Sequence, residues 1–289
     1  MAKILGVGIA TLDIINTVNH YPQEDEELRA STQRITRGGN VTNTLSVLSQ
    51  YGHNCYWAGV LCNDSDVKHI THDLEKNKID YSYCQLLEQG KIPTSYITLN
   101  QQTGSRTIVH YRDLPELSFE AFKKIQLTNF DWIHFEARDV SENIKMIQWV
   151  KENFPDKPIS IEIEKKRQDI EKLFSMADLY IFSKHYAKTL GFESSEDFIK
   201  HLSDLHTNED IICTWGEAGA FALTESKKLI HQPAFIVEIP VDTIGAGDTF
   251  NAGIIHGRIN QLNWEDTLET ASKLAAKKCK QAGFDSLVL

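Results

Sequence analysis

Short apolar segments alternate with helix-like segments along most of this 289-residue chain, and the alternation restricts the fold more than any other feature. The strand-like segments are near-continuous apolar runs, as expected for strands buried on both faces of a parallel sheet. In chain order the strand-like and helix-like segments are Ile4–Ile9, Cys55–Val60, Asp66–Lys76, Trp132–Glu136, Ser141–Phe154, Ile159–Ile163, Leu179–Phe182, Ile211–Cys213 and Trp264–Lys280. The pattern predicts a three-layer α/β fold, with a mostly parallel central sheet and helices on both of its faces.

Two pairs of strand-like segments have no helix between them. Residues 13–37 and 94–112 each have the pattern of a hairpin, the second with a turn at residues 101–104. We expect these four strands to form a small β-sheet that acts as a lid over a ligand. Its uncovered face would need a partner, so we expect a homodimer formed through two lids. No linker or repeat marks a second domain, and residues 1–289 are predicted to form one domain.

The composition argues against several classes of partner. The net charge of −10 opposes nonspecific binding to nucleic acid or to an anionic membrane, because both require a basic face. The five cysteines are scattered without a C-x-x-C pair, which favours a reducing compartment over a disulfide framework or a zinc site. The sequence shows no signal peptide and no long apolar run, so we expect a cytoplasmic protein.

The run D-T-I-G-A-G-D-T-F-N, which begins at Asp242, carries the strongest functional signal. It joins a strand-like segment, Phe235–Val241, to a helix-like segment, Asp248–Arg258. A glycine turn at the start of a helix brings free N–H groups together and favours phosphate binding. Asp248 would repel phosphate, but a general base that accepts a proton from an attacking hydroxyl is needed at that place. The alternative is a glycine turn with a capping acid and no catalytic role.

A second polar stretch, R-G-G-N-V-T-N, begins at Arg37. Gly39 lets the backbone approach a small ligand, and Asn40 suits the N-cap of the helix that follows. Asn43 lies about one turn further on, and two such amides can bind vicinal hydroxyls as donor and acceptor. Asp13, just beyond the first strand, can accept two further hydroxyls. The alternatives are a capped helix with a polar face and a solvated turn acid.

Four further groups of residues could contact a nucleotide or line a cleft. Arg106, in the second hairpin, could close onto phosphates. The turn G-E-A-G that begins at Gly216 follows a strand and lets the backbone approach a nucleotide. Small residues in the last helix either leave room for adenine or pack in the core. Glu136 and Arg138, at the end of a strand, could line the cleft, and Lys184, which follows the strand Leu179–Phe182, could face nucleotide phosphates.

The runs D-T-I-G-A-G-D-T-F and G-G-N-x-x-N resemble the C-terminal and N-terminal signatures of the ribokinase, or phosphofructokinase-B, family of sugar kinases. The likeness covers nearly the whole chain and implies the ribokinase-like fold. Within the family the chain is most similar to the ketohexokinase group, the ATP-dependent fructose 1-kinases. The matching strings include G-S-R-T-I from Gly104, W-I-H from Trp132, E-I-E-K from Glu162 and G-F-D from Gly283.

This resemblance implies an ATP-dependent kinase that phosphorylates a primary hydroxyl of a ketohexose, converting fructose to fructose 1-phosphate, with Asp248 as the base. The implied sugar contacts are Asp13, Gly39, Asn40, Asn43 and Asp248, with Asp25 reaching the sugar of the partner subunit. The implied nucleotide contacts are Arg106, Gly216, Glu217, Ala218, Gly219, Gly245, Ala246 and Gly247, of which the last three would form the anion hole.

The implied cofactors are ATP and Mg²⁺. Many members of the family carry an N-x-x-E motif tied to magnesium, but here that place reads S-K-H-Y from Ser183. We therefore expect Mg²⁺ to be held mostly through water and name no protein ligand for it. Alternative functions are a kinase for ribose, adenosine or another sugar, and a sugar-binding protein without turnover. A nicotinamide-dependent oxidoreductase is suggested by Gly6 and Gly8, although Leu12 occupies the position of the third fingerprint glycine.

Overall fold

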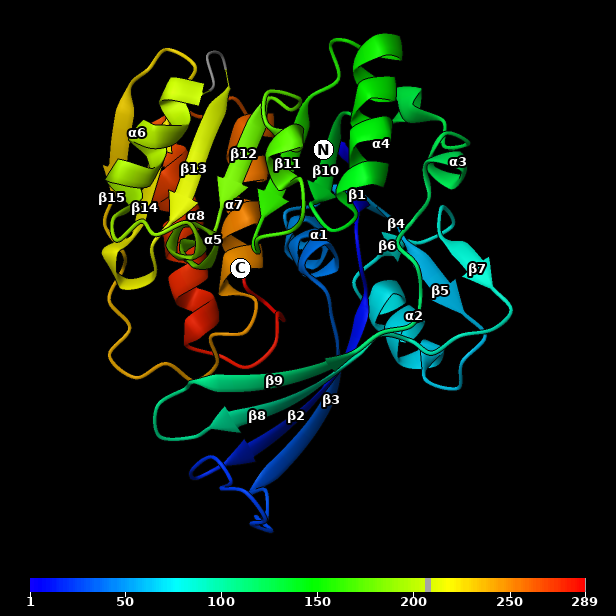
Figure 1. The fold of residues 1–289 in the computed structure, drawn as a ribbon, viewed down its shortest axis with the longest axis vertical. Coiled ribbons are helices and arrows are strands. Elements are labelled where there is room, and N and C mark those ends of the chain that lie inside the picture. The colour runs from blue at the N-terminus through cyan, green and yellow to red at the C-terminus, as the bar shows by residue number, and fades with distance from the viewer. Residues whose placement is uncertain (206–208, 289) are drawn as a thin grey trace.

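The computed structural model describes residues 1–205 and 209–288, and a nine-stranded sheet lies at the centre of this part of the chain (Figure 1). Its strands are β1 (Lys3–Val7), β4 (Asn54–Ala58), β6 (Ile79–Asp80), β10 (Trp132–Glu136), β11 (Ile159–Ile163), β12 (Leu179–Phe182), β13 (Asp210–Thr214), β14 (Ala220–Leu223) and β15 (Leu229–Gln232). They lie in the order β15-β14-β13-β12-β11-β10-β1-β4-β6. Neighbours from β13 to β6 are parallel, whereas β14 and β15 pair antiparallel at one edge. The predicted mostly parallel sheet is confirmed.

Helices cover both faces of this sheet, also as predicted. They are α1 (Asn40–Gln50), α2 (Val67–Lys76), α3 (Phe119–Phe122), α4 (Val140–Asn153), α5 (Lys184–Thr189), α6 (Ser195–Leu205), α7 (Ala246–Ile259) and α8 (Trp264–Cys279). In Figure 1, α4, α5 and α6 lie in front of the sheet, and α7, which packs on α1 and α8, lies behind it. Strands β10, β11 and β12 are buried along their whole length, which accounts for their mostly apolar sequences. Among the described helices, none combines the length and apolar character needed to cross a bilayer.

A separate four-stranded sheet stands away from the central one, at the bottom of Figure 1. It contains β2 (Thr11–Val18), β3 (Thr32–Gly38), β8 (Thr94–Asn100) and β9 (Arg106–Tyr111), in the order β3-β2-β8-β9. The two predicted hairpins are the antiparallel pairs β2–β3 and β8–β9, and they join through parallel pairing of β2 with β8. We call this sheet the lid. Ile15, Ile97 and Leu99 pack against Ile244 on one of its faces, the inner face.

The outer face of the lid leaves large apolar side chains in solvent. Tyr96, Val109 and Tyr111 are 50%, 67% and 51% exposed, and Ile35 on the neighbouring strand β3 is 47% exposed. The register places Ile35 opposite Ile14, and Ile14 opposite Tyr96, so they share one face. Exposed apolar surface of this kind is typical of an interaction site.

Two sequence predictions are wrong in detail. Phe235–Val241 is not a strand but an irregular connection between β15 and α7. Pro233 and Pro240 cannot donate ladder hydrogen bonds, and Ile236 and Ile239 are 85% and 80% exposed. The predicted strand Cys55–Val60 is interrupted at Gly59, where a side chain would collide with the Trp57 ring. The chain beyond this break forms β5 (Val60–Cys62), which pairs with β7 (Gln85–Leu87) in a small sheet of its own.

Candidate active site

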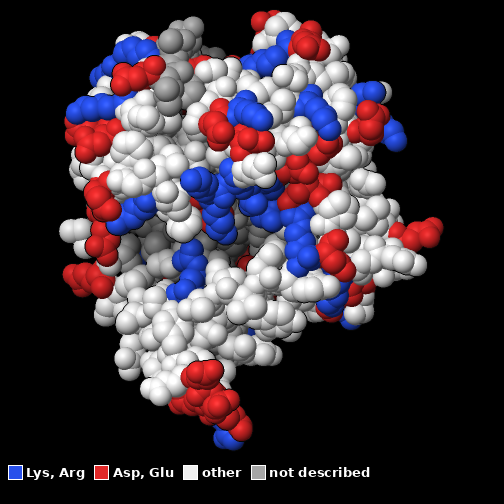
Figure 2. All heavy atoms as spheres, in the orientation of Figure 1, with Lys and Arg blue, Asp and Glu red and all other residues white. Residues whose placement is uncertain are grey.

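A cavity of about 900 Å³ lies between the carboxyl ends of the central strands and the inner face of the lid. Nine of the predicted site residues line it: Asp13, Gly39, Asn40, Asn43, Arg106, Gly216, Gly245, Gly247 and Asp248. Figure 2 shows Lys and Arg side chains gathered around this hollow, although the chain as a whole carries a net charge of −10. The cavity can therefore accept an anionic ligand despite the acidic composition.

The glycine turn forms one wall of the cavity. Gly245 is the N-cap of α7 and has a φ of 77°, a left-handed conformation that glycine adopts without strain. A Cβ atom on Gly245 would lie 2.3 Å from the Phe284 ring, so no side chain fits there. Around Gly247, by contrast, the space where a Cβ would stand is open. The first N–H groups of α7, which have no partner inside the helix, thus border the open cavity and suit an anion.

Asp248 lies in the first turn of α7 and is held from the neighbouring helix α1. Its Oδ2 accepts a 2.7 Å hydrogen bond from Nδ2 of Asn43, and its backbone carbonyl accepts one from the Thr44 hydroxyl at 3.1 Å. Asp248 lines the cavity although only 7% of its surface is exposed. The two predicted motifs therefore meet directly, and the Asn43 amide fixes the carboxylate that was predicted to be the base.

Asn43 is itself fixed by Arg37, whose role the sequence did not reveal. The Arg37 guanidinium is buried and donates to Oδ1 of Asn43 at 2.9 Å and to the Thr42 hydroxyl at 2.8 Å. It also pairs with Asp73 of α2 at 2.5 Å. This network sets the direction of the Asn43 amide, and so leaves its nitrogen to donate to Asp248.

Asp242 fixes the other end of the glycine turn. Its Oδ1 accepts from the Ile244 backbone N–H at 2.9 Å, and its Oδ2 pairs with Arg34 of the lid at 2.8 Å. The fully buried ammonium of Lys278 lies 3.5 Å from the same oxygen and donates to the Asp242 carbonyl at 3.1 Å. Although burial raises the pKa of Asp242, the charges of Lys278 and Arg34 prevail and hold it below its usual range. The lid, the turn and α8 are thereby joined at one ionised carboxylate.

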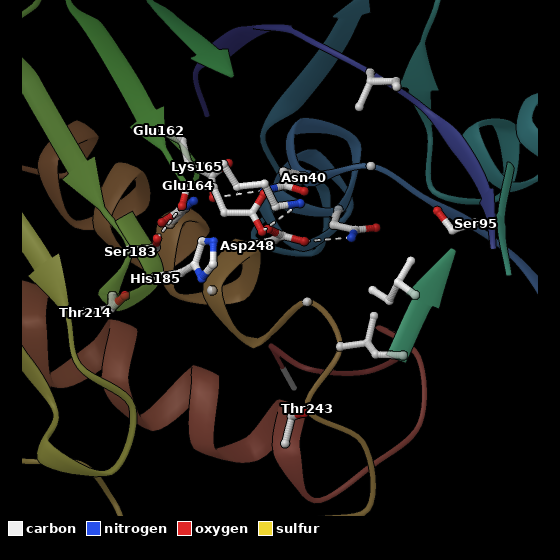
Figure 3. A pocket seen from close by; sticks show the side chains of 18 of the residues that line it. Asn40, Ser95, Glu162, Glu164, Lys165, Ser183, His185, Thr214, Thr243 and Asp248 are labelled. Carbon is white, nitrogen blue, oxygen red and sulfur yellow. Dashed lines mark hydrogen bonds and ion pairs between the residues drawn. The ribbon is translucent and has the colours of Figure 1, made fainter. Parts of the chain in front are cut away.

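The end of β11 brings two more acids to the cavity. Nδ2 of Asn40 donates to Oε1 of Glu162 and to Oε2 of Glu164, both at 3.2 Å. Figure 3 shows Asn40, Glu164 and Asp248 grouped in one part of the cavity. The prediction that Asn40 would cap α1 is wrong, because Gly39 is the N-cap and Asn40 is already in the helix. Its amide is free to reach β11 for that reason.

Two acids in this group, Asp248 and Glu162, have pKa values shifted upward. Burial, followed by the negative charges of Glu164 and Glu136, raises the pKa of Asp248 to about 8, against the opposing hydrogen bond from Asn43. Burial and the charge on Asp248 raise the pKa of Glu162 well above its usual range. A carboxyl with a raised pKa accepts a proton readily once it is ionised, which is the property that a general base needs.

On the lid side of the cavity, Asp13 points its carboxylate into a polar corner. It accepts a hydrogen bond from the Thr11 hydroxyl at 2.8 Å and is 7% exposed. Burial raises its pKa, although hydrogen bonds from Thr11 and Ser95 oppose the shift. Ser95 and His110 of the lid line the same cavity and lie 3.2 Å apart. This end of the cavity is rich in hydroxyl partners, as a sugar site requires.

The opposite end of the cavity is suited to phosphates. Arg106, the first residue of lid strand β9, donates to the Thr243 hydroxyl at 3.1 Å and so reaches from the lid to the glycine turn. Lys184, the first residue of α5, lines the cavity and lies over the Trp215 ring at 5.7 Å. Arg138 also lines the cavity and is paired with Glu136 and Glu116. The expectation that Arg138 lines the cleft is confirmed, whereas Glu136 is not among the lining residues, and the contact of Lys184 with phosphates stays a prediction.

A second, mostly apolar cavity of about 560 Å³ adjoins the first and shares Thr214, Gly216, Thr243 and Gly247 with it. The predicted residues Glu217, Gly219 and Ala246 line this second cavity. So do Ala275 and Cys279 of α8, whereas Leu268 and Ala271 are fully buried in the core. Ala275 and Cys279 therefore border a cavity, Ala271 packs in the core, and a role of these residues toward adenine stays a prediction.

Two predicted site residues lie elsewhere. Asp25 is in the exposed acidic loop between β2 and β3, which forms the red tip at the bottom of Figure 2. Ala218 lines neither cavity, and its carbonyl lies 2.9 Å from Nε2 of His231. The role of Asp25 depends on a second subunit and stays a prediction.

The acids of the cavity do not form a complete metal site. Across residues 1–205 and 209–288, no three His, Cys, Asp or Glu side chains converge closely enough to hold an ion by themselves. Oε2 of Glu162, however, is buried without a hydrogen-bond partner in this part of the chain. An unpaired carboxylate oxygen in a cavity suited to anions fits Mg²⁺, which takes one or two carboxylates and completes its shell with water and phosphate.

Comparison with known proteins agrees with this geometry. The family described as pfkB family carbohydrate kinase matches residues 1–288. A ketohexokinase from Mus musculus is 38% identical over 294 residues, covering 99% of each chain. Solved ribokinases from Giardia lamblia and, in complex with ADP, from Cryptococcus neoformans var. grubii share the fold. The Giardia structure has a TM-score of 0.85 and 15% identity, and the match covers 100% of this chain and 96% of that one. The Cryptococcus structure has a TM-score of 0.82 and 18% identity, and the match covers 100% of this chain and 97% of that one. The chain belongs to the pfkB family of carbohydrate kinases.

Proposed function

We propose that the chain transfers the γ-phosphoryl group of ATP to a primary hydroxyl of a ketohexose, forming fructose 1-phosphate from fructose. The observation that carries the proposal is the position of Asp248, at the start of α7, beside the open Gly247 corner and under the Asn43 amide. Such an acid serves a reaction that removes a proton from a hydroxyl next to phosphate. The similarity to a ketohexokinase over nearly the whole chain supports the choice of acceptor.

The two cavities suit the two substrates. The apolar cavity beside α8, with Phe250, Ala275 and Ala276 in its lining, suits an adenine ring, and the complex of a structurally similar ribokinase with ADP supports a nucleotide as one of the substrates. The phosphates would extend over the glycine turn toward Arg106 and Lys184. The sugar would lie at the other end, among Asp13, Asn40 and Asn43. This arrangement directs the transferred group at a hydroxyl beside Asp248.

In the proposed reaction Asp248 accepts the proton of the attacking hydroxyl. The N–H groups at the start of α7 and the Arg106 guanidinium then stabilise the charge that develops on the transferred group. Mg²⁺, when bound with the nucleotide, neutralises phosphate charge. Because Asp248 is buried and its pKa is raised, we expect kcat/KM to increase as the pH rises toward 8.

We also propose that two chains pair through their lids. The exposed outer face with Tyr96 and Val109 supplies an apolar contact surface. The acidic tip around Asp25 would then reach toward a partner's cavity, whose rim carries Lys and Arg side chains.

The five cysteines are all free thiols, which favours the reducing environment of a cytoplasm.

A coupled assay of ADP formation tests the acceptor. Purified protein is mixed with ATP, Mg²⁺ and fructose, ribose or adenosine, and kcat/KM is compared across the panel. The proposal predicts the highest value with fructose and 1-phosphate as the product, identified by ³¹P NMR. A higher value with ribose or adenosine would show a different member of the family, and ATP consumption that is independent of any sugar would refute a sugar kinase.

A further inference from the structure

Two glutamates at the end of β11 share one hydrogen-bond donor. Glu162 is the last residue but one of β11, and Glu164 lies just beyond the end of the strand. Because the two are two positions apart, both side chains project from the same face. Each accepts from the same nitrogen of Asn40 at 3.2 Å. A single neutral amide nitrogen therefore stands near two carboxylates of like charge.

The two glutamates differ in their positive partners: in the described chain Glu164 has one, whereas Glu162 has none. Glu162 is 7% exposed, and its Oε2 has no hydrogen-bond partner in the described chain. Lys165 lines the same cavity, and its ammonium lies 3.5 Å from Oε1 of Glu164 although the side chain is 56% exposed. Two further cations, Arg138 and Arg37, are engaged by Glu116, Glu136 and Asp73. Among the described residues no cation pairs with Glu162, and a buried carboxylate without a cation is unfavourable.

We propose that Glu162 and Glu164 bind the divalent cation that accompanies the nucleotide. The inference rests on the function proposed above. Both glutamates line the same cavity as the glycine turn and Asp248, so an ion beside them would lie next to the transferred phosphate. Two carboxylates with water and phosphate oxygens form the set that Mg²⁺ prefers, which agrees with the lack of a three-residue cluster in the described chain.

The test measures the cation directly rather than through turnover. Mn²⁺ replaces Mg²⁺, and its free concentration is followed by electron paramagnetic resonance, with the protein alone and with a non-hydrolysable ATP analogue. The variants are Glu162→Gln and Glu164→Gln. Glu152→Gln, on the exposed surface of α4, removes the same charge away from both cavities and serves as the control.

We expect the ternary complex of the wild-type protein to bind Mn²⁺ more tightly than the analogue alone does. Each cavity variant should lose roughly tenfold or more of this affinity, and the Glu152 variant should lose none. Melting temperatures show whether the variants fold. Glu162→Gln should melt no lower than the wild type, because it removes a buried charge while keeping an acceptor for Asn40.

Wild-type Mn²⁺ affinity in both cavity variants would overturn the proposal, as would a wild-type complex that binds no more tightly than the analogue alone. Failure of the parent proposal looks different. If no sugar is phosphorylated while Mn²⁺ binding depends on the two glutamates, the function is wrong and the cation site stands. If fructose is phosphorylated while both variants bind Mn²⁺ normally, the cation site is wrong and the function stands.

Discussion

Replacing Asp248 with asparagine should stabilise the protein, by an amount that depends on pH. Burial among other acids raises the pKa of Asp248 from 3.8 to about 8 in the folded chain. Between these two values the unfolded chain has already lost the proton that the folded chain keeps. The free energy of unfolding therefore falls as the pH rises through this window and becomes constant above about pH 8.

The magnitude follows from the size of the shift. Each pKa unit corresponds to about 1.4 kcal/mol, so the shift sets a ceiling of roughly 5–6 kcal/mol above pH 8. The charges of Glu164 and Glu136 contribute to the same shift and can relax by taking up protons themselves. We therefore expect Asp248→Asn to gain roughly 2–4 kcal/mol at pH 9 and almost nothing at pH 4. The asparagine oxygen can still accept the hydrogen bond from Asn43.

Urea unfolding at pH 4, 6, 8 and 9, followed by circular dichroism, measures this difference. Asp156→Asn, on an exposed turn, is the matched control and should follow the wild type at every pH. A gain that grows between pH 4 and 8 and then levels off supports the buried acid cluster. A destabilised Asp248→Asn protein, or a difference that does not change with pH, would refute the reasoning.

Three further predictions concern the neighbouring contacts. Asn43→Ala removes the 2.7 Å hydrogen bond that directs Asp248 and should lower kcat by roughly 10–100-fold in the coupled assay, whereas an unchanged kcat would dismiss the positioning role. Gly245→Ala forces a Cβ toward Phe284 at a left-handed φ and should lower the free energy of unfolding by roughly 1–3 kcal/mol, and a melting temperature equal to the wild type's would contradict this. Val109→Glu should separate the proposed lid dimer into monomers in sedimentation velocity, and a wild-type sedimentation coefficient would argue against that interface.

The sequence predicted the central sheet because the strand signal there is strong. Buried strands such as β10 and β11 are short, mostly apolar runs that alternate with helices, and that pattern admits few other structures. The two lid hairpins could be predicted because the two strands of each hairpin follow one another in the sequence without a helix between them. The segment Phe235–Val241 has the same local composition as a strand but stays irregular. Pro233 lies just before it and Pro240 lies within it, and the segment pairs with no strand of the described chain.

The candidate site was predicted where local sequence determines the backbone. Gly245 and Asp248 are next to each other in the chain, and a glycine turn before a helix places them with little help from the rest of the fold. Contacts between distant segments were missed. Nothing in the sequence connects Arg37 with Asp73, or Lys278 with Asp242, since these pairs exist only after α2 and α8 have packed.

The same limit applies to the acids of β11. Glu162 and Glu164 were noticed only as part of a string shared with a family, because alternating acids at the end of a strand are common. Their relation to Asn40 and Asp248 became visible when the carboxyl ends of the strands were placed around one cavity. The network that surrounds Asp248 is therefore a property of the tertiary structure.

The turnover number of Asp248→Asn with fructose and MgATP tests the central claim most directly. If Asp248 accepts the proton of the attacking hydroxyl, kcat should fall by roughly 10²–10⁴ while the affinity for ATP stays close to the wild type's. A variant that folds, binds ATP and keeps kcat within about tenfold of the wild type's would show that another group performs the proton transfer.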